Sequence, residues 1–169
     1  WTALFAAGSN VNDVNCTVMA AKGAPGGAQV GYTLGIRVGG VEQRISAPVD
    51  KTVPVGRWAR IAYTQEGSTA RLYIDGEVVA EKTDMTNTIG DAYVVGEKCY
   101  LAKSPYPADP TATGRIDNFK IYTRALSADE LVADVMANQE IVEKDKAALD
   151  LGEIAPFTEN NLGVISRYI

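Results

Sequence analysis

The chain contains no histidine among its 169 residues. This absence excludes Ser-His-Asp and Cys-His nucleophilic catalysis, histidine-ligated zinc and the commonest general base at neutral pH. The two cysteines, Cys16 and Cys99, are too few for a disulfide scaffold or a tetrahedral zinc site. Two states stay open for this pair, buried free thiols or a single disulfide, and we favour the free thiols.

The chain also lacks any cluster of lysine and arginine and any long apolar run. Its formal net charge is -5, whereas a nucleic-acid partner requires a concentrated basic surface. No apolar run approaches the roughly 20 residues that a membrane-spanning helix needs. The sequence therefore argues against nucleic-acid binding and against insertion into a membrane.

Paired carboxylates at strand spacing are missing as well. A glycosidase needs only two carboxylates, so the lack of histidine does not exclude one. Asp75 and Glu77 lie two residues apart, but at the tip of an expected hairpin. Asp129 and Glu130 fall in the first turn of an expected helix, where negative charge complements the helix dipole. The sequence therefore indicates a chain without catalytic activity.

Short segments with period-two hydrophobicity, separated by turn residues, make up the first two-thirds of the chain. In residues 32–38 the apolar side chains occupy every second position, which predicts a strand with one buried and one solvent-facing side. Gly39-Gly40 then reverses the chain into a strand over residues 41–47. Asp75-Gly76 is the residue pair that a type I′ hairpin turn favours. Repeated short strands of this kind predict an antiparallel β-sandwich.

The most informative stretch runs from residue 114 to residue 131. Residues 115–122 predict a buried strand, with a bulge near Asp117-Asn118 that brings its apolar side chains onto one face. The sequence Ser127-Ala-Asp-Glu130 is a capping box, which predicts a helix that begins at Ala128.

Four motifs, in the family's usual order, resemble those of the laminin-G-like, concanavalin A-type modules associated with carbohydrates. They are Gly-Arg-Trp-Ala-Arg-Ile-Ala-Tyr-Thr over 56–64, Leu-Tyr-Ile-Asp-Gly over 72–76, Tyr-Leu-Ala-Lys-Ser over 100–104, and residues 114–131. The resemblance implies an all-β fold over residues 1–138, an antiparallel jelly-roll sandwich with a short C-terminal helix. Residues 139–169 are expected to form a linker and the start of a bacterial immunoglobulin-like module, because residues 145–152 resemble the opening of one.

The resemblance implies a noncatalytic carbohydrate-binding module of a larger extracellular or cell-surface protein, a bacterial glycosidase acting on arabinan or xylan. The alternative is a structural spacer or protein-interaction sandwich that binds no sugar. Sugar modules use an exposed aromatic ring, and Tyr106 and then Tyr93 are the candidates for carbohydrate binding. The competing interpretation of Tyr106 is that its ring folds back and closes one end of the sandwich.

The resemblance also implies a structural Ca²⁺ site. In the family, the aspartate at the position of Asp117 joins backbone carbonyls and an acidic residue from near the start of the domain. Asp109 is a second candidate ligand, and oxygen ligands of this type suit Ca²⁺. The family commonly carries another acidic residue after this aspartate, where this chain has Asn118.

Finally, the first strands of the family's sandwich are expected to be missing before Trp1, so the predicted strand over 115–122 lacks a neighbour. Such an edge exposes backbone donors and acceptors and is a template for another strand. Residues 162–169 are one candidate for that strand, and a second molecule is the other.

Overall fold

The computed structural model describes residues 2–9, 14–19, 31–92 and 98–137. The strands are β1 (Ala3–Ser9), β2 (Val14–Met19), β3 (Thr33–Val38), β4 (Val41–Ser46), β5 (Ile61–Glu66), β6 (Thr69–Ile74), β7 (Glu77–Lys82) and β8 (Cys99–Leu101). A short helix, α1 (Ile89–Ala92), precedes β8, and a further helix covers residues 128–137. The predicted linker, the start of an immunoglobulin-like module and Tyr93 lie outside the described residues.

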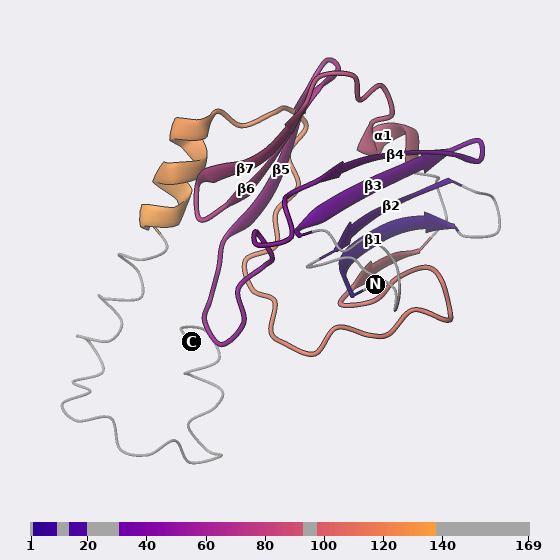
Figure 1. Ribbon diagram of the computed structural model, residues 1–169, viewed down its shortest axis with the longest axis horizontal. Coiled ribbons are helices and arrows are strands. Elements are labelled where there is room, and N and C mark those ends of the chain that lie inside the picture. The colour runs from indigo at the N-terminus through magenta and orange to yellow at the C-terminus, as the bar shows by residue number, and fades with distance from the viewer. Residues whose placement is uncertain (1, 10–13, 20–30, 93–97, 138–169) are drawn as a thin grey trace, which may run out of the picture.

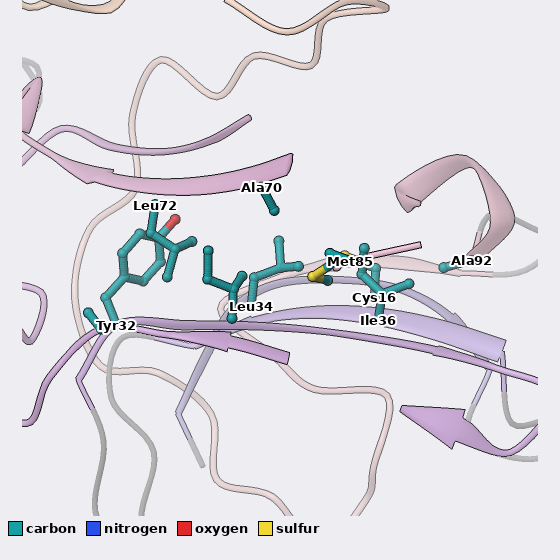
Figure 2. Close-up of a cluster of buried hydrophobic side chains, with 10 residues drawn as sticks. Cys16, Tyr32, Leu34, Ile36, Ala70, Leu72, Met85 and Ala92 are labelled. Atoms are coloured by element: carbon teal, nitrogen blue, oxygen red, sulfur yellow. The ribbon is translucent and has the colours of Figure 1, made fainter. Parts of the chain in front are cut away.

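The strands form two antiparallel sheets that pack face to face (Figure 1). One sheet has the order β4-β3-β2-β1-β8 and the other has the order β5-β6-β7. Figure 2 shows the core between them, where Ala70 and Leu72 of β6 face Leu34 of β3 and its neighbour Tyr32. The structure therefore confirms the predicted all-β sandwich.

Two glycine-containing turns connect neighbouring strands as the sequence predicts. Gly39 and Gly40 both have positive φ angles, 56° and 79°, between β3 and β4. Asp75 and Gly76 have φ angles of 52° and 87° between β6 and β7. Positive φ at both central residues is the requirement of a type I′ turn, so the predicted hairpin tip is confirmed.

The outward-facing side of β3 is partly buried, whereas the sequence predicts that it faces solvent. Thr33 and Gly35 are buried even though they lie on the side away from the core. The long side chains of Glu42 and Arg44 on β4 lie over Gly35, and a Cβ added there would approach the Glu42 carboxylate to 2.8 Å. Side chains of the neighbouring strand, rather than the second sheet, therefore cover Gly35.

Residues 115–122 form no strand, which corrects the prediction from the sequence. The segment runs past β1, where the rings of Phe119 and Phe5 are 5.0 Å apart, and Ile121 is 68% exposed. Asn118 takes a φ of 52°, which interrupts an extended backbone at the expected bulge. A strand needs a hydrogen-bonded neighbour, and the described residues place none beside this segment.

The helix over residues 128–137 begins where the sequence predicts. The Glu130 amide donates to the Ser127 hydroxyl at 3.2 Å, and the Ser127 amide donates to the Glu130 carboxylate at 2.9 Å. Asp134 attaches the helix through ion pairs with Arg60, which precedes β5, and with Lys120. The capping box is therefore confirmed. No described helix has the length and apolar character to cross a membrane.

Candidate functional site

A row of residues crosses the outer side of the five-stranded sheet. Strand pairing aligns Tyr100 of β8 with Ala6 of β1, Thr17 of β2, Gly35 of β3 and Arg44 of β4. Directly paired residues point to the same face, so all five lie on the side away from the core. We call these five residues the cross-strand row. Its central residues are small, whereas a ring and a guanidinium occupy its two ends.

The two ends of the cross-strand row carry different chemistry. At the β4 end, the Glu42 carboxylate forms ion pairs with Arg44 and, at 3.8 Å, with Arg37. At the β8 end, the Lys103 ammonium lies 5.6 Å from the centre of the Tyr100 ring. One end therefore offers charged hydrogen-bonding groups, and the other offers an aromatic face with a neighbouring cation.

The hydroxyl of Thr17 lies at the centre of the cross-strand row. The side chain is buried, and its oxygen has no hydrogen-bond partner in the part of the chain that the structure describes. Buried polar groups in native proteins almost always have a partner, so an unpartnered hydroxyl calls for an explanation. A buried water molecule would satisfy it, as would a ligand hydroxyl once the side chains that cover Thr17 move aside.

Tyr106 lies over the same side of the sheet. Its hydroxyl accepts a 3.0 Å hydrogen bond from the side-chain amide of Asn15, two residues before Thr17 on β2. Asn15 also donates to the Ser9 carbonyl at 3.3 Å, and the Tyr106 amide donates to the Ser104 hydroxyl at 3.1 Å. The ring is half-buried. The structure thus brings one predicted sugar-binding residue to the cross-strand row, while Tyr93 lies outside the described residues.

The two predicted calcium ligands occupy different segments. Asp117 is exposed, and its carboxylate accepts a 2.7 Å hydrogen bond from the Asn118 amide. Asp109 is half-buried in the proline-rich loop that carries Tyr106. Among the described residues, no three His, Cys, Asp or Glu side chains are grouped to hold a metal ion. The resemblance implies a site that also uses backbone carbonyls, and calcium binding stays a prediction from that resemblance.

The two cysteines are free thiols in different environments. Cys16 is buried and Cys99 is exposed, so only the first matches the prediction of buried thiols. Both pair with Ala7, on opposite sides of β1. Two strand spacings separate them, roughly 10 Å, and a disulfide allows only about 4.4–6.8 Å between Cα atoms. Burial, with a smaller contribution from Cys99, raises the pKa of Cys16 to about 12.

Residues 2–132 match the family model described as the concanavalin A-like lectin/glucanases superfamily. The chain belongs to this superfamily. The match confirms the resemblance drawn from the four sequence motifs. The superfamily assignment agrees with the two-sheet sandwich, although it does not by itself locate a binding site. A search of curated proteins finds no match.

Two solved structures resemble this superfamily member. The CBM40 of Ruminococcus gnavus IT-sialidase, bound to alpha2,3 sialyllactose, has a TM-score of 0.58 at 19% identity, covering 79% of this chain and 73% of its own. That likeness concerns the fold. An S-layer domain-containing protein from Clostridium thermocellum is 25% identical with a TM-score of 0.42. The match covers 79% of this chain and 62% of that one, so this chain spans less than two-thirds of its length.

Sequence reasoning missed Asn15, Thr17 and Arg44. Each of them is an ordinary polar residue in a strand, and nothing in its local pattern distinguishes it from a solvent-facing side chain. The signal in the sequence that could have identified them is that each residue occupies an outward-facing position in the alternating pattern of its strand. Only the register between strands places Arg44 and Tyr100 in one row.

Proposed function

We propose that this superfamily member is a noncatalytic carbohydrate-binding module whose ligand binds on the cross-strand row. The observation that carries the proposal is the unpartnered Thr17 hydroxyl, which lies between an aromatic ring and an arginine on one face of the sheet. The fold likeness to a sialidase module that is described bound to a sialylated sugar supports a carbohydrate ligand.

The chemistry of the row suits a sugar. The ring of Tyr100 packs against sugar C–H groups, while the guanidinium of Arg44 and the carboxylate of Glu42 exchange hydrogen bonds with hydroxyls. Each such hydrogen bond contributes about 0.5–1.5 kcal/mol net. A binding energy of about 4 kcal/mol corresponds to a Kd of about 1 mM. We therefore expect a single module to bind weakly. Binding becomes strong only when several modules act together.

The setting of the module is also part of this proposal. Residues 1–138 form the module, and residues 139–169 form a linker and the start of an immunoglobulin-like module in a larger bacterial protein. That protein is an extracellular or cell-surface glycosidase acting on arabinan or xylan, and its other domains are the module's partners. The support for these points is the family resemblance of the sequence motifs.

A structural spacer that binds no sugar is the second candidate function. It is favoured by one observation, the hydrogen bond between Tyr106 and Asn15 that holds the ring half-buried. A ring held in this way exposes less of its face for stacking on a sugar than an unrestrained tyrosine ring would. Titration with sugars distinguishes the two functions, because a spacer gives no binding signal with any sugar.

The test is calorimetric titration of the chain with arabinan and arabinoxylan oligosaccharides and with α2,3-sialyllactose. Arg44→Ala and Thr17→Val should each weaken the binding of the sugar that binds by about fivefold or more, because each removes a hydrogen-bonding group from the row. Arg71→Ala is the matched control, since Arg71 makes a similar ion pair with Glu81 on the other sheet. Tyr106→Ala should lower affinity by about 1 kcal/mol or more if its ring stacks on the sugar.

Equal binding by Arg44→Ala and Arg71→Ala would show that the cross-strand row is not the binding site. The absence of heat with every sugar would favour the spacer.

Hydrolysis is tested in parallel by measuring the release of reducing sugar. We expect none, because the sequence has neither histidine nor carboxylates at alternate positions of a predicted strand. Release that disappears when one carboxylate is replaced would contradict the noncatalytic assignment.

A further inference from the structure

The charged end of the cross-strand row lies on a strand with a single neighbour. β4 is an edge of the five-stranded sheet, and among the described strands only β3 pairs with it. Its outward-facing residues Glu42 and Arg44 form the ion pair at this end of the row, and both retain access to solvent. An edge strand lacks the second ladder of hydrogen bonds that holds a central strand. The position of Arg44 therefore depends on what else fixes β4.

The side chain of Gln43 provides a second attachment for β4. Strand pairing places Gln43 opposite the core residue Ile36, so its side chain points to the face opposite that of Arg44. Its Oε1 accepts hydrogen bonds from the backbone amides of Thr86 and Asn87 at 2.8 and 2.7 Å. Its Nε2 donates to Thr86 Oγ1 at 2.9 Å. Three hydrogen bonds from one side chain thus tie β4 to the loop that follows β7.

Asn87 extends this attachment to the turn of the hairpin. Its Nδ2 group donates to the carbonyl oxygens of Ile36 on β3 and Val41 on β4, both at 3.3 Å. These two residues lie on either side of the turn at Gly39-Gly40. The loop over residues 83–88 therefore contacts both strands of the β3–β4 hairpin.

The same loop is also held by the opposite sheet. Met85 is fully buried in the core, and its amide donates to the Ser68 carbonyl at 3.0 Å. Gln65 on β5 donates from its Nε2 group to the carbonyl oxygens of Met85 and Asn87, at 2.9 and 3.3 Å. The Tyr63 hydroxyl donates to Gln65 Oε1 at 2.6 Å, which orients this amide. Two glutamines, one from each sheet, therefore hold the loop between them, and a loop fixed in this way can in turn fix β4.

We propose that Gln43 and Asn87 are positioning residues for sugar binding at the charged end of the cross-strand row. They hold the β3–β4 hairpin so that Arg44 and Glu42 face the ligand. This inference rests on the proposed function and adds that the affinity of the row depends on a loop outside it. A slip of β4 by one residue would turn Arg44 toward the core. Smaller movements would also weaken binding, because a mobile binding group must be ordered when the ligand arrives.

Calorimetric titration of variants with arabinan and arabinoxylan oligosaccharides and with α2,3-sialyllactose tests this role. Gln43→Ala should weaken binding by about two- to fivefold, and no more than Arg44→Ala, because it acts through the ordering of that residue. Ser127→Ala is the control, since it removes a helix cap away from β4 and should leave the affinity unchanged. Gln43→Glu should retain most of the affinity, because a carboxylate still accepts from both loop amides and the Thr86 hydroxyl can turn to donate to it.

The combination with Arg44→Ala separates positioning from a general loss of structure. Once Arg44 is replaced, Gln43→Ala should weaken sugar binding little further, because the main group that Gln43 positions is gone. Fully additive losses in the double variant would overturn the inference. It would also be overturned if Arg44→Ala binds more weakly while Gln43→Ala binds as well as Ser127→Ala.

Amide hydrogen exchange tests the attachment without any sugar. Gln43→Ala and Asn87→Ala should each speed exchange in the β3–β4 hairpin and leave exchange in β6 unchanged, because only the hairpin loses its attachment to the loop. Unchanged exchange in the hairpin would refute the inference whatever the titrations show. If none of the sugars binds, the proposed function fails and the positioning role fails with it. Weaker binding by Arg44→Ala but not by Gln43→Ala refutes the positioning role alone.

Discussion

Replacing Ser127 by alanine removes one half of the capping box that starts the helix over residues 128–137. The Ser127 hydroxyl accepts from the Glu130 amide at 3.2 Å. That amide has no acceptor within the helix, because the residue four positions earlier, Leu126, lies before the helix begins. Loss of a serine cap costs about 1 kcal/mol of stability. For a chain of this size that cost lowers the melting temperature by about 2–4 °C.

Thermal unfolding at pH 7, followed by circular dichroism, measures this loss, and Ser127→Thr is the control because threonine retains the capping hydroxyl. The second half of the box adds a pH signature. Hydrogen bonds from the Arg124 side chain and then from the Ser127 amide lower the pKa of Glu130 from its ordinary value of 4.5 to about 2. A lowered pKa stabilises the fold above the ordinary value, and this contribution is lost as the pH falls from 4.5 through about 2.

Glu130→Gln should lack that part of the pH dependence, because the side chain no longer titrates. The reasoning fails on either of two results. One is an unchanged melting temperature in Ser127→Ala at pH 7. The other is a Glu130→Gln variant that loses stability between pH 4.5 and 2 as steeply as the original chain.

Two further predictions concern the cysteines and calcium. A thiol reagent should label one cysteine per folded chain and two in denaturant, because Cys99 is exposed while burial raises the pKa of Cys16 to about 12; two labels on the folded chain, or none, would contradict this. If the family resemblance extends to the metal, the melting temperature should be higher in Ca²⁺ than in a chelator, and Asp117→Asn should abolish the difference. Equal melting temperatures of the original chain in the two solutions would show that this module has no stabilising calcium site.

The sequence by itself determined the features that depend on neighbouring residues. The turn at Asp75-Gly76 needs two residues that accept positive φ, and the cap needs a serine three residues before a glutamate. Both requirements are met within a few positions, so the pattern carries the information. The family and the all-β class followed from several such local patterns in order.

The tertiary structure alone decided which residues of distant strands meet. Whether residues 115–122 form a strand depends on a hydrogen-bonded neighbour, and the described residues supply none, although the pattern of the segment is that of a strand. Thr17 and Arg44 became candidates for sugar binding only through the register of β2, β3 and β4. Strand pairing joins residues far apart in the chain, and a one-residue shift would turn each side chain to the other face. For that reason the cross-strand row is a property of the folded sheet, and the sequence of any single strand does not reveal it.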